Sequence, residues 1–352
     1  MNQKIPLIVA LNLVVVTPLT LLGGEKMVIE MENVNRTQDR SLNRFSIGPQ
    51  FSFNYKADFK NSALFFNPVN PGPAIGGTNH FYDDGFVQVD GSGNFGGLTG
   101  FWGYTNASQV VGPGTGTGIE FHAVQAGGPS STEDDDPQYG FEIVYQRVLG
   151  DLPTESPGIW GFQAGFSYTD LDLHGRNRGT TPVIIDTYPL NGVLPPLAPY
   201  NGTFPGPGAL LGDTPVRTLG AATLIGDQKL SGDLFALRLG PFVEWELTPK
   251  LSVSASAGLT LAPTRLDYDF SETATLASGA TFTNSGHSSN TEILYGAYLE
   301  TRLRYDYSEN WGVYVAAQFQ TLNSMQQSVG GRSAEFDPGA TFALSTGITW
   351  QF

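Results

Sequence analysis

The chain has 352 residues, of which only 14% are charged, while glycine accounts for 44 residues and aromatic side chains for 12%. Because charged residues make up about 25% of a typical soluble domain, this composition favours short alternating β-strands over helices. The net charge of −15 argues against a nucleic-acid partner, since phosphate binding needs a basic surface. The absence of cysteine excludes disulfides, zinc–thiolate sites, iron–sulfur clusters and cysteine nucleophiles.

The N-terminus has the pattern of an export signal. Lys4 is followed by a mostly apolar stretch over residues 5–22 and then by glycines at 23–24. A positive start, an apolar middle and small residues are typical of a secretory signal peptide. An uncleaved signal anchor is the alternative, which Pro18 and Thr20 disfavour. We therefore predict a Sec-type signal peptide over 1–24, a short periplasmic segment over 25–43 and a single barrel over 44–352.

Alternation of apolar and polar residues dominates the remainder of the chain. Leu251, Val253 and Leu259, for example, alternate with Ser252 and Ser254. This period of two indicates strands, and about ten residues per segment is the length typical of a transmembrane barrel. No later stretch holds about 18 consecutive apolar residues, so a membrane-embedded protein would have to be a closed barrel. In chain order the predicted strands are 45–55, 98–111, 117–125, 139–146, 160–168, 235–247, 251–262, 293–305, 311–320 and 342–352.

The connections between these strands fall into two classes. If the C-terminus is periplasmic, the periplasmic links are mostly short, and the external links are mostly long, above all those over 57–97, 172–231 and 271–291. Outer-membrane barrels sort their loops in this way, whereas a soluble β-sandwich, the alternative, has no reason to. The expected fold is all-β, a transmembrane antiparallel up-and-down β-barrel of about ten strands with long extracellular loops. Eight or twelve strands remain alternatives, because 98–111 and 117–125 alternate weakly.

Aromatic residues gather beside the proposed periplasmic turns, as in the girdles of membrane barrels. Residues 4–24, the alternating hairpins and the ending 347–352 together resemble the outer-membrane β-barrel superfamily, in an OmpA-like or porin-like form, and 82–87 with Trp102–Tyr104 are similar to its uncharacterised members. The resemblance implies location in the outer membrane of a Gram-negative bacterium, contact with outer-membrane lipid and assembly by the barrel-assembly machinery. Its implied assembly signal consists of Ile348, Trp350 and Phe352.

Several charged residues fall on the predicted inner face of neighbouring strands. A barrel of this size has a narrow interior that side chains largely fill. Two interpretations stay open, a buried ion-pair network that plugs the lumen and a lining that selects permeating solutes. The predicted lumen-lining charged residues are Arg238, Glu244, Glu246, Glu300, Arg302 and Arg304.

Two weaker patterns point to enzymes. Asp172 and His174, with an acidic pair at 83–84, are similar to the catalytic groups of omptin-type surface proteases, which activate a water. His287, Ser288 and Glu292 resemble the groups of lipid-A deacylase barrels. Both are more simply explained as polar loop residues.

The acidic run 133–136 could bind calcium, although a solvated acidic loop explains it better. We expect no metal and no cofactor. The sequence thus favours a non-enzymatic integral outer-membrane barrel with a structural role or a binding role carried by its loops. A small porin and an omptin-like or lipid-A-modifying hydrolase are the alternatives, and the oligomeric state is open.

Overall fold

A computed structural model describes most of the chain. The chain divides into Met1–Arg40 and Ser41–Phe352, and the predicted signal peptide and nearly all of the periplasmic segment lie outside the described residues. No helix in the described ranges is both long and apolar enough to cross a membrane. The described residues are 42–61, 70–114, 116–125, 127, 130–133, 137–153, 158–204 and 206–352.

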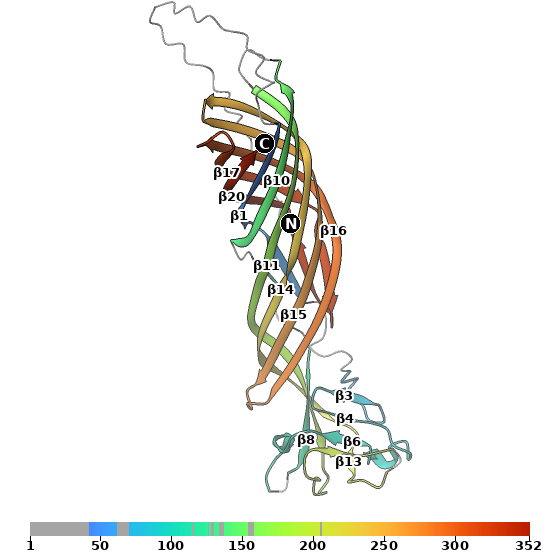
Figure 1. Ribbon diagram of the computed structural model, residues 1–352. Coiled ribbons are helices and arrows are strands. Elements are labelled where there is room, and N and C mark those ends of the chain that lie inside the picture. The colour runs from blue at the N-terminus through green and yellow to red at the C-terminus, as the bar shows by residue number, and fades with distance from the viewer. Residues whose placement is uncertain are drawn as a thin grey trace, which may run out of the picture. The chain divides into compact units, whose positions relative to one another are not determined.

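Eight antiparallel strands form a closed ring (Figure 1). Each strand pairs with two neighbours, and β1 closes the ring because it pairs with β10 on one side and β20 on the other. This confirms the all-β up-and-down barrel and selects the eight-stranded alternative. In ring order the strands are β1 (Asn43–Phe53), β10 (Gln138–Asp151), β11 (Gly158–Pro189), β14 (Val216–Thr248), β15 (Leu251–Leu276), β16 (Thr281–Asp306), β17 (Trp311–Leu322) and β20 (Ala340–Gln351).

The two weakly alternating segments lie outside the ring. β8 (Gly118–Val124) is a strand, but it pairs with the far end of β11, where Val124 lies opposite Val183. The segment 98–111 breaks into short pieces: residues 100–101 separate the first two, and a 3-10 turn at Ala107–Gln109, capped reciprocally by Asn106 and Gln109, separates the last two. Those pieces are β5 (Leu98–Thr99), β6 (Trp102–Tyr104) and β7 (Val110–Val111).

The expected long loops over 172–231 and 271–291 are mostly strand. β11 continues for 32 residues and β14 for 33, and they stay paired from Gly158 to Thr187. β15 and β16 likewise continue past the other ring strands. The prediction of loops was wrong here because apolar and polar residues still alternate in these segments. The apolar side chains now point inward and the polar ones outward, which is the reverse of the pattern in the ring.

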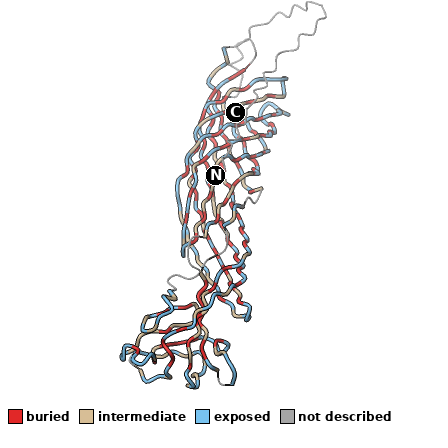
Figure 2. The backbone as a smooth tube through the Cα atoms, turned by 180° about the vertical axis from the view of Figure 1, so that it is seen from behind, coloured by how far each residue is buried: buried red, intermediate tan, exposed pale blue. Residues whose placement is uncertain are grey.

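A second sheet continues the shorter ring strands. It contains β18 (Met325–Val329), β19 (Arg332–Asp337), β2 (Lys56–Asn61) and β9 (Ser131–Glu133), in that order. Its apolar side chains pack against those of the long strands, as when Phe59 stacks on Tyr268 with ring centroids 6.1 Å apart. Figure 2 shows buried and exposed residues alternating along the strands. Beyond the ring, between the long strands and the second sheet, the interior is therefore an apolar β core.

A small sheet forms near the β8–β11 pairing. It contains β3 (His80–Tyr82), β4 (Gly85–Val87), β6 and β12 (Tyr200–Asn201), while β13 (Leu211–Gly212) pairs with β5. Its inner face packs Trp102 and Tyr82 against Phe121 and Tyr188. We call β3, β4, β6 and β12 the small sheet.

Candidate functional site

The direction of hydrophobic alternation reverses part-way along the long strands. On β11, Trp160 and Phe162 are exposed while Gln163 is buried, yet farther on Leu173 is buried while His174 is exposed. β15 repeats the change, with exposed Leu259 and Leu261 followed by buried Leu266 and Tyr268. The exposed apolar residues therefore form a band around the ring that ends where the second sheet begins. On β20 this band covers 342–350, close to the ~9–11 residues with which a tilted strand crosses a bilayer.

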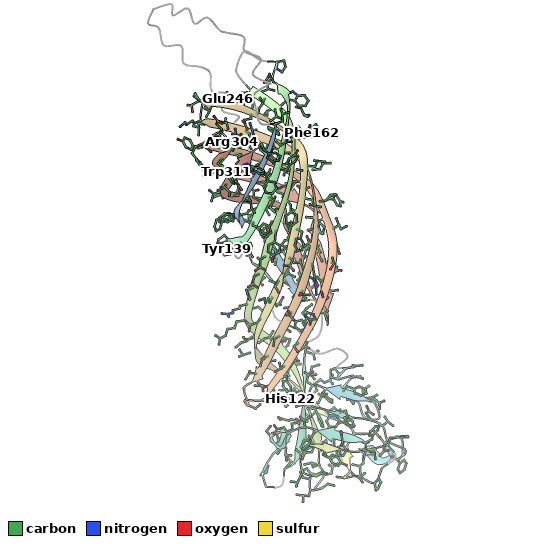
Figure 3. All side chains as sticks on the ribbon, in the orientation of Figure 1. His122, Tyr139, Phe162, Glu246, Arg304 and Trp311 are labelled. Carbon is green, nitrogen blue, oxygen red and sulfur yellow. The ribbon has the colours of Figure 1, made fainter. Side chains whose placement is uncertain are left out.

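Aromatic side chains mark both ends of this apolar band. Trp311 and Trp350 stack with centroids 6.3 Å apart at one end, and Tyr139 lies toward the other (Figure 3). Phe352 stacks on Trp350 at 4.4 Å, and its backbone N–H donates to the carbonyl of Asn43 at 2.9 Å. Aromatic belts at both edges are typical of membrane-embedded barrels.

Of the predicted assembly signal, Ile348 and Trp350 lie on the outer face of β20, and Phe352 directly follows the end of that strand. Ile348 lies opposite Ile47 and Val313, and Trp350 lies opposite Trp311 on the neighbouring strand. All three side chains are exposed.

Four charged side chains meet inside the ring, in what we call the central cluster. Arg238 lies 2.7 Å from Glu142 and 3.1 Å from Glu300, and Arg302 lies 2.9 Å and 3.1 Å from the same two carboxylates. Ser345 also donates to Glu142 at 2.8 Å. Each carboxylate thus faces two guanidinium groups, which offsets the desolvation that otherwise makes buried charges costly.

A second cluster lies nearer the short turns. Glu244 accepts from Arg44 at 2.5 Å and from Arg304 at 3.1 Å, and Arg304 also lies 3.2 Å from Asp306. Glu246, which was predicted to line the lumen with the others, is solvent-exposed near the end of β14. It is exposed because it is so close to the turn that the ring no longer encloses it.

Five of the six predicted lumen residues therefore come together, in two clusters, and sequence reasoning missed Glu142 and Arg44. Both side chains lie on the inward face of their strands. Their positions in the alternation of each strand could have predicted this from the sequence. Which charges meet depends on ring closure, which brings Glu142 and Arg302 together across 160 residues of sequence. The side chains of the central cluster are 0–3% exposed.

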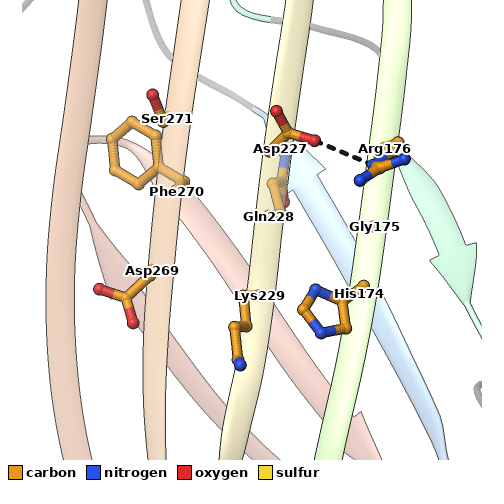
Figure 4. Close-up of a pocket in the computed structure, with 9 residues that line it drawn as sticks. All are labelled: His174, Gly175, Arg176, Asp227, Gln228, Lys229, Asp269, Phe270 and Ser271. Carbon is orange, nitrogen blue, oxygen red and sulfur yellow. Dashed lines mark ion pairs between the residues drawn. The ribbon is translucent and has the colours of Figure 1, made fainter.

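The omptin-like arrangement does not form. Asp172 accepts from His174 at 3.1 Å and Lys229 at 2.9 Å beside an exposed pocket of about 370 Å³ (Figure 4). Although partial burial opposes it, these hydrogen bonds hold the pKa of Asp172 below its usual range. The acidic pair 83–84 instead contacts β8 near the Val124–Val183 pairing, eleven residues (183 − 172) farther along β11. At ~3.3 Å per residue that is roughly 36 Å, so these groups cannot share a water.

The lipid-A deacylase arrangement also fails on geometry. His287 points outward from β16 and binds Asp269 at 2.8 Å, whereas Ser288, the next residue, points to the opposite face. Glu292 accepts from the amide of Asn290 at 3.0 Å. Both enzymatic assignments to these particular residues are therefore wrong.

The acidic pair 83–84 has a different place in the structure. Asp83 accepts from the N–H of Val124 at 2.7 Å, and Asp84 accepts from both the N–H and the ring Nδ1 of His122, at 2.8 and 2.6 Å. Burial, reinforced by the charge of Asp84, raises the pKa of Asp83 to about 7. These contacts fasten the β3–β4 turn to β8.

The calcium hypothesis cannot be followed into the structure, because 134–136 lie outside the described residues. Among the residues that are described, no group of three or more His, Cys, Asp or Glu side chains could hold a metal ion.

Comparison with known proteins identifies no family for this sequence. No protein-family model and no curated protein matches it. Solved structures that match include Ail, the attachment invasion locus protein of Yersinia pestis (9% identity, 88% of this chain and 99% of that chain, TM-score 0.28). The outer membrane protease OmpT from Escherichia coli (10%, 88% and 96%, 0.29) and a FadL homologue from Pseudomonas aeruginosa (10%, 89% and 91%, 0.20) also match.

Proposed function

We propose that this chain is an integral outer-membrane protein whose barrel is closed to solutes and holds an extracellular β-structure that binds a partner. The reversal of alternation is the observation that carries the proposal. A soluble protein would not surround a ring with exposed aliphatic and aromatic side chains and fill that ring with Arg, Glu, Gln and Ser. In lipid the same arrangement is expected, since the apolar band faces acyl chains.

The closed lumen is supported by the central cluster. Its two Arg and two Glu side chains are buried, and Gln163 extends the network by donating to Glu300 at 3.3 Å and accepting from Gln146 at 2.8 Å. A small porin would need a water-filled path where these side chains lie. We therefore infer that the ion pairs are a plug rather than a selectivity lining.

The binding role is supported by what lies beyond the apolar band. The long strands form a rigid base with its own apolar core, and the small sheet adds a second core built largely from aromatic side chains. Binding residues are commonly carried by loops that a rigid scaffold positions, as the segments around the small sheet are here.

Location and assembly complete the proposal. Sec-type export through residues 1–24 would deliver the chain to the periplasm of a Gram-negative bacterium. The barrel-assembly machinery would then recognise the terminal strand through Ile348, Trp350 and Phe352. Outer-membrane lipid would contact the apolar band.

Two measurements test the proposal. Fractionated cells should yield an outer-membrane protein whose gel mobility changes on boiling, because a closed barrel resists detergent until it is heated. Purified protein in planar bilayers should give no ion conductance. A soluble protein without a heat-dependent shift would refute membrane insertion, and steady single-channel currents would refute the closed lumen while leaving the barrel intact.

A further inference from the structure

The small sheet carries a pocket with a mixed lining. Its volume is about 250 Å³, and it lies where β4, β6 and β12 run side by side. Gly103 lies between Phe86 and Asn201 in the sheet pairing and contributes to the lining. A Cβ at Gly103 would lie 2.7 Å from both the Phe86 ring and the Asn201 Oδ1, so only glycine lets these two side chains approach each other here. We call this the Gly103 pocket.

The aromatic walls of the Gly103 pocket are held in place from behind. Phe86 packs edge-on against Phe101 with centroids 5.6 Å apart. On the inner face of the small sheet, Tyr200 packs on the fully buried Trp102 at 4.8 Å and so supports the β6–β12 pair from behind, and the Trp102 indole N–H donates to the carbonyl of Ala209 at 2.7 Å. Because these rings are already ordered, a ligand would lose little free energy in ordering them.

The polar groups at the Gly103 pocket are uncharged. No Asp, Glu, Lys, Arg or His is among the described residues that line it. Asn201 is solvent-exposed, and its amide makes no hydrogen bond within the described part of the chain. The Thr105 hydroxyl donates to Gln109 at 3.2 Å and keeps its lone pairs available as acceptors.

This lining selects among ligand classes. An anion would find no cationic side chain here, and a cation no carboxylate. An apolar side chain would bury the Asn201 amide without a hydrogen-bond partner, which is unfavourable. A sugar ring has one C–H face that can lie on Phe86 and a rim of hydroxyls that can bond Asn201 and Thr105, which lie on the same face of the small sheet.

We propose that the Gly103 pocket binds one ring of a neutral glycan. Phe81 lies directly opposite Phe86 across the β3–β4 pair and is 42% exposed, so it offers a second aromatic surface to the adjoining sugar unit. The glycan is thus an oligosaccharide or longer. This inference rests on the proposed binding role of the extracellular structure and gives that role a ligand class.

The test uses the full chain in detergent and isothermal titration with a panel of neutral hexasaccharides, built from glucose, galactose, mannose or N-acetylglucosamine in α and β linkage. At least one should bind, and Phe86→Ala or Asn201→Ala should weaken that binding more than tenfold. Phe95→Ala is the matched control, because Phe95 is a phenylalanine of the same region that is 87% exposed and does not line the pocket. It should bind as the unmodified protein does.

Three outcomes would overturn the inference. These are no binding by any neutral glycan in the panel, tighter binding of a heparin hexasaccharide or of an apolar peptide, and a glycan affinity that Phe86→Ala and Asn201→Ala leave unchanged. Gel mobility of each variant with and without boiling shows, independently of glycan binding, whether the barrel has folded. Protein that keeps its heat-dependent shift but binds no glycan therefore refutes this inference and not the membrane proposal.

Discussion

Replacement of Val315 by arginine tests whether the apolar band faces lipid. Val315 is 56% exposed on β17 and lies four residues from Trp311 and four from Phe319, the outermost exposed large apolar residues of that strand. Four residues at ~3.3 Å, on a strand tilted by about 40°, place Val315 roughly 10 Å inside either edge of the band, near the bilayer midplane. An arginine there should lower the free energy of unfolding by about 2–4 kcal/mol.

The assay is urea unfolding of protein folded into phospholipid vesicles, followed by the heat-dependent gel shift. A cost of that size lowers the ratio of folded to unfolded protein roughly 30- to 1000-fold, since about 1.4 kcal/mol corresponds to a factor of ten. Leu219→Arg is the matched control, because Leu219 is 78% exposed on β14 but lies beyond the band. If both variants lower the free energy of unfolding equally, or if Val315→Arg does not lower it, the assignment of the band to lipid is refuted.

Three further predictions concern the cluster, the β3–β4 turn and the C-terminus. Arg302→Met should destabilise the barrel by about 3–5 kcal/mol in the same urea assay, and adding Glu300→Gln should restore part of that loss; an unchanged midpoint would contradict the account of the cluster. The folded pKa of Asp83, about 7, exceeds the ordinary aspartate value of 3.8, so the contribution of Asp83 to stability should be lost as pH rises from about 4 to 7. Proteolysis of the small-sheet region should therefore accelerate over that range in the unmodified protein and not in Asp83→Asn; identical profiles would argue against this role. Phe352→Ala should delay the appearance of heat-shifted protein in pulse-labelled cells while the refolded protein keeps its urea midpoint, and normal assembly kinetics would count against a C-terminal signal.

The sequence predicted the ring well and the structure beyond it poorly, for one physical reason. In the apolar band, residues such as Leu259 and Ile348 alternate with small or polar ones, and that pattern has a single structural meaning in lipid. Beyond the band, Leu171 and Leu173 alternate with Asp172 and His174 in the same period. These segments also contain charged residues, proline and glycine, which are typical of loops, so the sequence predicted loops where the structure has strands. The sequence of a strand predicts which of its side chains share a face, but it does not predict which other strands will pair with it.

The candidate sites illustrate the same limit. Sequence proximity suggested Asp172 with His174, and they do lie 3.1 Å apart, yet their proposed acidic partners lie roughly 36 Å farther along the strand at ~3.3 Å per residue. Conversely, Glu142 and Arg238 are 96 residues apart in the chain and 2.7 Å apart in the ring. The Gly103 pocket had no sequence signal beyond its aromatic residues, because its walls come from strands at 85–87, 102–104 and 200–201.

The reversal of alternation along uninterrupted strands also constrains how the chain can mispair. β11 and β14 stay in one continuous register from Gly158 to Thr187, and β15 and β16 do so from Leu251 to Thr275. Since a slip of one residue turns every side chain to the other face, it would expose polar groups to acyl chains within the apolar band and bury Asp and His side chains in the core beyond it. Because the same strands run through the apolar band and the core beyond it, a single pairing error would destabilise the protein in both environments, lipid and water.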